Sequence, residues 1–367
     1  MKNKCIVILI ALFFLSLSVW NILGEKNAYS ESERRALQKF PETNMETILN
    51  GEFADEFEDY AVDHFPARDM WRSVKANVKN VFLAQKDNHG LFVVEKHLSK
   101  LEYPMNTKML DHAVQVFTKV KNLYLDKNDS ERNTRIYLAV IPDKNRYIAK
   151  ENGYLSMDYD AFSNYLKENM DYATYIEIAD YLDAEDYYYT DSHWRQEKIV
   201  DVAKHLNDVM SGGSFSDNQS TPAYEIIDLN IPFYGVYVGQ SAMKCEPDHL
   251  ICLSNDTIEA LKVEGANAVY DMGKANGRDP YEMFLSGNQP VVTLENPLND
   301  NGRRLIVFRD SYGASIAPLL AEAYSEVVLV DLRYVSSEMV GQFVDFGNAD
   351  VLFLYSTTLL NNSLSLK

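Results

Sequence analysis

Most of the chain is built from two kinds of apolar pattern. The first is a short, mostly apolar run, which is typical of a buried strand; such runs cover residues 90–94, 134–141, 303–308, 327–330 and 351–355. The second repeats its apolar residues at helical spacing, over residues 108–123, 159–170, 194–210 and 314–323. Strands that alternate with helices predict an α/β fold with a parallel sheet.

The amino-terminal residues follow neither pattern. Lys2 and Lys4 precede an uncharged run from Cys5 to Gly24, close to the roughly 20 residues that span a bilayer. No small-x-small cleavage site follows the run. We therefore expect residues 1–24 to be an uncleaved signal anchor in the cytoplasmic membrane, with the rest of the chain outside it. A cleaved signal peptide is the alternative.

The remainder divides into a lead-in and a main domain. Residues 25–88 are charged and helix-prone, with an intermittent apolar face, and predict a helical stalk or cap. Residues 89–367 are expected to form the main domain. Within it, residues 212–300 are richer in Gly, Asn, Asp and Pro, which indicates loops, short strands and the wall of a site.

Composition narrows the function. The 367 residues carry a formal net charge of -19, which argues against nucleic acid or an anionic surface as an electrostatically attracted partner. No Cys/His spacing resembles a zinc site, and neither a phosphate-binding Gly-Lys-Ser/Thr loop nor a dinucleotide-binding Gly-x-Gly-x-x-Gly motif occurs. We therefore expect chemistry without a metal or cofactor. Cys245 and Cys252 either form a loop disulfide or remain free thiols.

A candidate nucleophile lies between a predicted strand and a predicted helix. Ser311 follows the strand at residues 303–308 and precedes the helix at residues 314–323. Open α/β sheets bind their ligands at the carboxyl ends of strands, and the free N–H groups of a helix N-terminus can stabilise an oxyanion. This position suits a nucleophilic serine. The alternative is that Ser311 only caps the helix.

A candidate base lies upstream. Asp191 precedes His193 by two residues, so its carboxylate could fix the tautomer of the imidazole. If the helix predicted at residues 194–210 begins here, its macrodipole favours the neutral form of His193, as a general base requires. Alternatively, Asp191 and Ser192 cap that helix. Together with Ser311, the pair makes serine-based acyl transfer the leading hypothesis.

These motifs carry a family resemblance. Residues 187–194 (YYYTDSHW), followed by a helix and later by residues 309–313 (RDSYG), resemble the DHHW family and the related AlgX/AlgJ-like alginate O-acetylation proteins. Similar segments occur at residues 33–41 (ERRALQKFP), 57–69 and 141–144 (IPDK), so the resemblance extends over nearly the whole exported chain. It implies a circularly permuted, SGNH hydrolase-like three-layer α/β/α fold with a mostly parallel sheet.

The resemblance also assigns roles. Ser311 becomes the nucleophile, His193 the base and Asp191 its partner. Ser192 replaces the first histidine of the family's Asp-His-His-Trp motif, and Arg309 replaces the small residue that usually precedes Asp-Ser. The Ser311 N–H is then the expected oxyanion donor.

Several further residues are candidates for substrate or oxyanion contacts. Gly287 and Asn288 could supply a second oxyanion donor, although Gly-Asn is also an ordinary turn pair. Trp194 is expected to form a pocket wall, and Asp310 and Tyr312 flank the nucleophile. Lys144 is expected to be solvated at the surface, and the alternative is that it orients the edge of the sheet.

The function implied is that of an exported, membrane-tethered O-acetyltransferase, or an acetylesterase if water is the acceptor. The resemblance implies a cell-surface polysaccharide as acceptor and a multi-pass membrane O-acyltransferase as the partner that delivers the acetyl group. The alternative is a non-catalytic polysaccharide-binding scaffold of a cell-envelope polymer synthesis complex. Convergence of Asp191, His193 and Ser311 within hydrogen-bond reach would favour the enzyme.

Overall fold

The computed structural model describes residues 2–24, 26–30, 32–79, 83, 85–126, 134–213, 215 and 223–367. Contacts divide the chain into two compact units. The first comprises Met1–Leu91 and Val236–Cys245, and the second comprises Phe92–Gly235 and Glu246–Lys367. The second stretch of the first unit is thus a short insertion within the loop-rich part of the sequence.

A seven-stranded sheet forms the centre of the second unit, in the order β6-β5-β13-β11-β12-β10-β9. Its strands are β5 (Ile136–Ile141), β6 (Thr174–Tyr175), β9 (Lys262–Glu264), β10 (Val291–Glu295), β11 (Arg304–Arg309), β12 (Glu326–Val330) and β13 (Asp350–Ser356). The run from β6 to β12 is parallel, whereas β10 pairs antiparallel with both β12 and β9. The mostly parallel sheet predicted from the apolar runs is confirmed.

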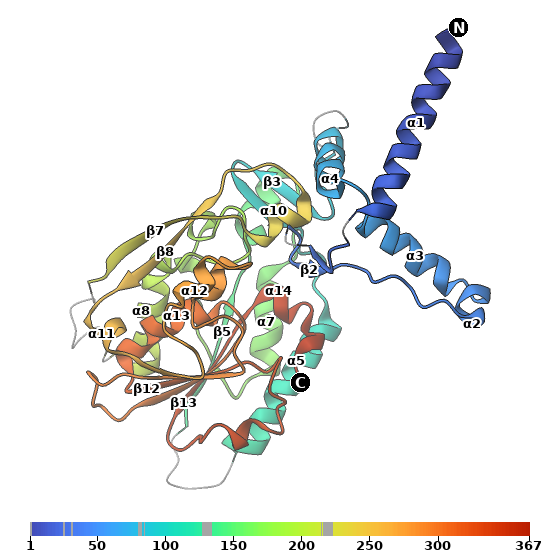
Figure 1. Ribbon diagram of the computed structural model, residues 1–367. Helices are drawn as coiled ribbons and strands as arrows, with labels where there is room; N and C mark the ends of the chain where they lie inside the picture. Colours follow the sequence, from blue (N-terminus) through green and yellow to red (C-terminus); the bar gives the residue numbers. More distant parts are fainter. Residues whose placement is uncertain are drawn as a thin grey trace. The chain divides into compact units, whose positions relative to one another are not determined.

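Helices cover both faces of this sheet (Figure 1). Leu305 and Val307 of β11 pack in one apolar cluster with α8 (Val200–Ser211) and α13 (Gly313–Leu320). Ile306 and Phe308 point the other way, into a cluster with α5 (Thr107–Val120) and α7 (Tyr159–Asn169). Because successive side chains of a strand alternate between faces, a continuous apolar strand requires cover on both sides. The result is the three-layer α/β/α architecture.

Smaller elements complete the second unit; β3 begins at Leu91, the boundary residue that is counted with the first unit. They are β3 (Leu91–Val94), β4 (His97–Lys100), α6 (Asn145–Ile148), β7 (Glu225–Phe233), β8 (Asp248–Ser254), α11 (Asp256–Ala260), α12 (Met272–Ala275) and α14 (Thr357–Leu360). The long hairpin of β7 and β8 lies in the region expected to hold loops and short strands. Residues 214 and 216–222 of that region lie outside the described residues.

One predicted helix is shorter than expected. Residues 194–210 contain a 3-10 turn at Gln196–Lys198, and α8 begins only at Val200. The Gln196 side chain donates to Ser315 O at 2.8 Å and accepts from Leu253 N at 2.9 Å. These long-range bonds fix the segment before the helix can start. Residues 338–343, which separate β12 from β13, contain only a 3-10 turn.

The first unit contains the helical lead-in. Its helices are α1 (Lys2–Leu23), α2 (Met45–Leu49), α3 (Glu52–Asp63), α4 (Arg68–Asn77) and α10 (Val236–Ser241), and β1 (Tyr29–Ser30) pairs with β2 (Arg35–Ala36). Of the expected lead-in, Glu25, Glu31, residues 80–82 and Ala84 lie outside the described residues.

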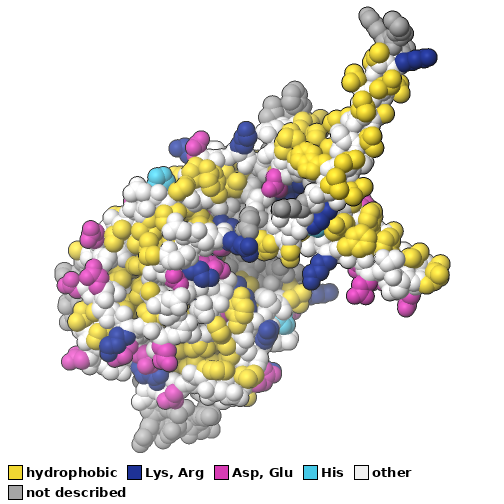
Figure 2. All heavy atoms as spheres, in the orientation of Figure 1, with side chains coloured by type: hydrophobic (Ala, Val, Ile, Leu, Met, Phe, Trp, Pro, Cys, Tyr) yellow, Lys and Arg dark blue, Asp and Glu magenta, His cyan; other side chains and the backbone are white. Residues whose placement is uncertain are grey.

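Helix α1 is long and apolar enough to cross a membrane. Its segment Lys4–Leu23 has a mean hydropathy of 2.6 and none of it is buried. Hydrophobic side chains cover its visible side in Figure 2. Length and composition fit a membrane anchor and a signal sequence equally well.

Candidate active site

A tight hairpin carries the aspartate and the histidine. Tyr187 and Trp194 form an antiparallel bridge, and Tyr188 N donates to His193 O at 3.0 Å. Asp191 therefore lies at the tip of the hairpin and His193 on its returning arm. Both arms are buried, since Tyr187, Tyr188 and Trp194 are all 0% exposed. The triple tyrosine thus serves as the base of this hairpin.

The tip of the hairpin is fixed from two other segments. The Asp248 carboxylate, at the start of β8, accepts hydrogen bonds from Tyr189 N at 2.7 Å and Thr190 N at 2.8 Å. Gly235 N donates to Thr190 Oγ1 at 2.8 Å. A Cβ atom at Gly235 would lie 2.3 Å from Thr190 O and 2.4 Å from Asp191 Cβ, so only glycine allows this approach.

Lys144 binds the backbone of the first arm of the hairpin. Its Nζ donates to Tyr188 O at 2.7 Å and to Tyr189 O at 3.2 Å, and the residue is 2% exposed. The expectation of a solvated surface lysine was therefore wrong. The two carbonyl groups replace water as partners of the ammonium, which makes its burial tolerable.

The serine lies on a turn between β11 and α13, as predicted. The Asp310 carboxylate accepts from Tyr312 N at 3.1 Å and from Ser356 N and Oγ, at the end of β13, at 2.8 and 2.7 Å. These bonds fasten the turn to the neighbouring strand. Ser311 does not cap the helix, because α13 begins at Gly313 without a side-chain cap.

The imidazole joins the two segments. His193 Nδ1 lies 2.6 Å from Asp191 Oδ1, and His193 Nε2 lies 2.7 Å from Ser311 Oγ. The side chain of Asp191 is 2% exposed and that of His193 is 14% exposed. A carboxylate, an imidazole and a hydroxyl in this order can transfer a proton away from the hydroxyl as it attacks a carbonyl carbon.

The structure excludes the cap alternative for Asp191 and corrects the helical placement of His193. Asp191 Oδ1 accepts from the His193 N–H and lies near the ring nitrogen of the same residue, so Asp191 does not cap a helix. Because α8 begins at Val200, His193 is not in a first helical turn and no helix dipole acts on it directly. The Asp191 carboxylate, and not a helix dipole, is the electrostatic partner of the ring.

Two residues that the sequence did not single out complete the surroundings of the imidazole. The ring of Tyr281 stacks on His193, with centroids 3.8 Å apart. Tyr281 OH and Trp194 Nε1 lie 2.9 and 2.8 Å from Ser315 Oγ. Tyr281 lies in the loop-rich region and Ser315 in a helix, and neither has a sequence signal beyond its residue type.

Three of the expected substrate contacts are buried. Trp194 is 0% exposed and donates its indole N–H to Ser315, so it lies behind the hairpin and forms no pocket wall. Tyr312 donates its hydroxyl to Ser192 O at 2.6 Å, which links the serine turn to the hairpin. The Asp310 carboxylate accepts hydrogen bonds from Ser356 N and Oγ. The side chains of Trp194, Tyr312 and Asp310 are thus buried and bonded within the protein.

Gly287 and Asn288 form a turn, the alternative that the sequence left open. Gly287 N donates to Phe284 O at 3.0 Å, and Gly287 has a φ of +82°. The exposed Asn288 side chain accepts from Arg333 Nη2 at 3.1 Å. The Gly287 N–H already has an acceptor, so it is not available as a second oxyanion donor.

The remaining oxyanion candidate is the backbone of Ser311. Within the described part of the chain the Ser311 N–H donates to no acceptor, whereas the Tyr312 N–H is bound by Asp310. Arg309, which replaces the usual small residue, is 0% exposed and folds beneath the turn. A Cβ at Gly313 would lie 2.6 Å from Arg309 Cβ, which explains the glycine of the RDSYG motif.

The residues described here contain no cluster of three or more His, Cys, Asp or Glu side chains that could hold a metal ion. Cys245 and Cys252 are free thiols. Burial raises the pKa of the Cys252 thiol to about 11, so it is a poor nucleophile at neutral pH.

Comparison with known proteins places the fold. No family model and no curated protein matches the sequence. A DHHW family protein from Eubacterium siraeum DSM 15702 matches with a TM-score of 0.56 and 17% identity over 75% of this chain and 93% of its own. Bacillus cereus PatB1, solved with a sulfonyl adduct, matches with a TM-score of 0.57 and 17% identity. This match covers 74% of this chain and 95% of PatB1. The O-acetyltransferase domain of Pseudomonas putida AlgJ matches with a TM-score of 0.45 and 13% identity. This match covers 74% of this chain and 92% of the AlgJ domain.

At these identities the likeness defines the fold. The chain shares its α/β fold with a DHHW family protein and with PatB1, as the sequence motifs had indicated. Shared fold does not by itself establish shared chemistry, which has to be argued from the site.

Proposed function

We propose that this protein is an exported, membrane-tethered serine O-acetyltransferase that acts on a cell-surface polysaccharide. The observation that carries the proposal is the pair of hydrogen bonds made by His193, one to Asp191 and one to Ser311. A scaffold has no need to hold these three side chains in contact. The alternative of a non-catalytic polysaccharide-binding scaffold has no comparable observation in its favour.

In the first half-reaction Ser311 becomes acetylated. Ser311 Oγ attacks the carbonyl carbon of the acetyl donor while His193 Nε2 accepts the hydroxyl proton. The Asp191 carboxylate stabilises the imidazolium formed, and the Ser311 N–H stabilises the oxyanion. Collapse of the tetrahedral intermediate expels the donor's leaving group, which takes the proton from His193 Nε2. The acetyl ester of Ser311 remains.

In the second half-reaction the acetyl group moves to the acceptor. A sugar hydroxyl gives its proton to His193 Nε2 as its oxygen attacks the acetyl-serine carbonyl. The Ser311 oxygen then leaves and regains a proton from the imidazolium, which restores the enzyme. The same steps with water as acceptor would make the protein an acetylesterase.

The acceptor and the partner are proposed from the family resemblance, and the location is proposed from α1. The family resemblance of the hairpin and serine-turn motifs favours polysaccharide as acceptor and a multi-pass membrane O-acyltransferase as acetyl supplier. The length and composition of α1 favour a membrane anchor. The sulfonyl adduct of PatB1 suggests a sulfonyl fluoride as a probe of Ser311, because such reagents sulfonylate activated serine hydroxyls.

The function is tested by the acetyl content of the cell-surface polymer. Cells that carry Ser311→Ala in place of the wild-type protein should make polymer that lacks O-acetyl groups. Ser365→Ala is the control and should leave acetylation unchanged, because Ser365 is exposed and lies outside the hairpin and the serine turn of the site. His193→Ala should match Ser311→Ala, and Asp191→Asn should retain more activity. Normal acetylation in the Ser311→Ala cells would refute the transferase. If cells without the protein lose the polymer, and Ser311→Ala and Ser365→Ala restore it equally, the protein is a scaffold.

A further inference from the structure

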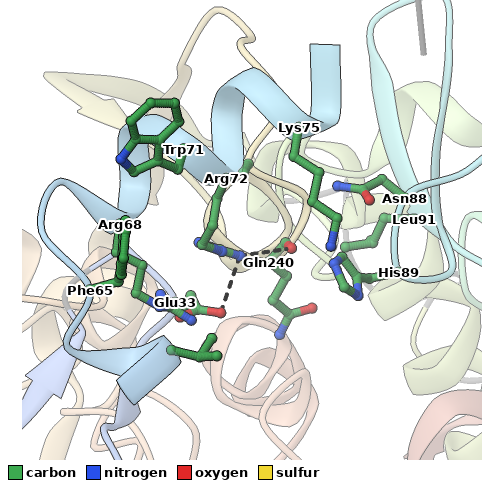
Figure 3. Close-up of a pocket in the computed structure, with 12 residues that line it drawn as sticks. Glu33, Phe65, Arg68, Trp71, Arg72, Lys75, Asn88, His89, Leu91 and Gln240 are labelled. Carbon is green, nitrogen blue, oxygen red and sulfur yellow. Dashed lines mark hydrogen bonds and ion pairs between the residues drawn. The ribbon is translucent and has the colours of Figure 1, made fainter. Parts of the chain in front are cut away.

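The first unit contains a cavity of about 560 Å³, separate from the residues of the proposed active site (Figure 3). One face of α4 lines it, through Arg68, Trp71, Arg72 and Lys75. These positions follow the spacing of a single helix face. One element thus supplies three cationic side chains and one aromatic side chain to the cavity wall.

The charge of α4 differs from that of the whole chain. Helix α3 carries six acidic residues and no basic one, and the protein as a whole has a net charge of -19. Helix α4 carries three basic residues in its cavity face and one acidic residue, Asp69. The net charge of the whole protein is negative and disfavours an anionic partner, whereas the side chains that α4 contributes to this cavity are mainly positive.

The cavity retains positive charge after its internal ion pairs are formed. Glu33 pairs with Arg68 and Arg72 at 2.5 and 3.1 Å, and Asp63 pairs with Arg68 at 3.2 Å. Asp69 lies 3.8 and 3.7 Å from the same two arginines. The Lys75 ammonium has no ion pair or hydrogen bond within the described part of the chain. The pKa of His89 is lowered by partial burial and then by the charge of Lys75, which indicates a positive potential at this point. Figure 3 shows Lys75 extending from α4 toward His89.

The other walls are apolar and accessible. Phe65 is 42% exposed and Trp71 is 41% exposed, and Val62 also borders the cavity. Exposed aromatic and aliphatic side chains beside cations are typical of surfaces that meet the boundary between lipid headgroups and acyl chains. A small hydrophilic anion would leave these groups uncovered.

One buried acceptor in the wall lacks a donor. Asn88 is 2% exposed, and its Nδ2 donates to Ser241 O at 2.7 Å. Its Oδ1 is buried and has no hydrogen-bond partner among the residues described. An unpaired buried acceptor is costly, so a ligand with a hydroxyl group fits this position.

The cavity is close in sequence to α1. Glu33 follows Leu23, the end of α1, by ten residues, which can span at most about 35 Å when fully extended. If α1 anchors the protein, Glu33 in the cavity wall lies within that distance of the end of the anchor.

We propose that this cavity binds an anionic phospholipid whose headgroup carries a hydroxyl, drawn from the membrane that α1 enters. The phosphodiester is held by Lys75 and Arg72, and the headgroup hydroxyl donates to Asn88 Oδ1. The proximal part of an acyl chain covers Phe65 and Trp71. This site does not depend on the chemistry of Ser311.

Native mass spectrometry of the full-length protein in a non-ionic detergent tests the proposal. Phosphatidylglycerol is the probe, phosphatidylcholine is the zwitterionic control, and inorganic phosphate is the competitor without a tail. We expect phosphatidylglycerol to bind more tightly than phosphatidylcholine. Lys75→Gln should weaken phosphatidylglycerol binding about fivefold, which corresponds to the loss of one cation near a lipid phosphate.

Matched variants separate the site from general effects. Lys108→Gln removes an exposed charge of the second unit and should leave binding unchanged, and Lys75→Arg should retain it. Trp71→Ala should weaken lipid binding, whereas Met70→Ala, exposed on the same helix and outside the cavity, should not. Equal affinity for the two lipids, no effect of Lys75→Gln, or full displacement by inorganic phosphate would overturn the proposal.

Discussion

The imidazole of His193 lies flat against the phenol ring of Tyr281, with their planes inclined by 14°. Tyr281 is 5% exposed and its hydroxyl lies 2.9 Å from Ser315 Oγ, so its ring is held at the hydroxyl end. Hydrogen bonds to Asp191 and Ser311 set the direction of the His193 ring nitrogens. The stacked phenol sets the plane of the ring.

Replacement of Tyr281 should therefore change turnover more than substrate affinity. Tyr281→Leu removes the stacking surface and should lower kcat for an acetyl ester about tenfold with little change in KM, because small misplacements of a base are costly. Tyr281→Phe keeps the ring and should retain most of the activity. Steady-state kinetics of the two variants distinguish positioning from a general loss of stability. Equal losses in both variants, or a change confined to KM, would contradict this role.

Lys144 should couple stability to activity. Lys144→Met keeps the length of the side chain but leaves the carbonyl groups of Tyr188 and Tyr189 without their charged donor. We expect the free energy of unfolding to fall by about 2 to 4 kcal/mol, and activity to fall because the hairpin loosens. Urea unfolding measures the first and ester hydrolysis the second. Lys150→Met, at an exposed position, should change neither, and a Lys144→Met protein as stable as wild type would contradict this account.

Glu102 should make stability depend on pH. Burial, followed by the charge of Asp143, raises the pKa of Glu102 to about 7. Between its ordinary value of 4.5 and about 7, the folded protein keeps this proton and the unfolded chain loses it. Stability should therefore fall as the pH rises through this interval and level off above it. The contribution is on the order of 3 kcal/mol.

The test for Glu102 is urea unfolding at acidic and at mildly alkaline pH. Glu102→Gln is neutral and nearly isosteric, so it should lose most of this pH dependence and be more stable than wild type above pH 7. Glu151→Gln, at an exposed position, serves as the control. Parallel pH profiles for wild type and Glu102→Gln would show that Glu102 is not the responsible group.

The anchor proposed for α1 predicts where the protein is found. The full-length chain should fractionate with membranes and keep its amino terminus, and a version that begins at Lys26 should be soluble. Amino-terminal sequencing of the protein from cells checks this directly. A mature protein that begins after the apolar run would identify a cleaved signal sequence.

The sheet was predictable because its central strands are buried on both faces. Apolar runs of the kind found in β5, β11 and β13 admit few other interpretations. The outer strands β9 and β10 gave no comparable signal, because they are short and mix polar with apolar residues. Their positions depend on pairing with strands far away in the sequence.

The reactive side chains were predictable as a set, but their supports were not. Asp191, His193 and Ser311 lie in motifs with recognisable spacing. The hairpin that carries His193 depends on Asp248 and Gly235, which lie more than forty residues away along the chain. No local pattern reports such contacts, and the helical periodicity after Trp194 indicated a helix that starts too early.

The most direct test of the central claim is intact mass spectrometry of the purified protein after exposure to an activated acetyl ester. We predict time-dependent addition of one acetyl group, mapped by peptide analysis to Ser311. Ser365→Ala should be acetylated like wild type, and Ser311→Ala should not be acetylated at this position or turn the ester over. Turnover that persists undiminished in Ser311→Ala, or a stable acetyl group only on another residue, would contradict the proposed serine acetyltransferase.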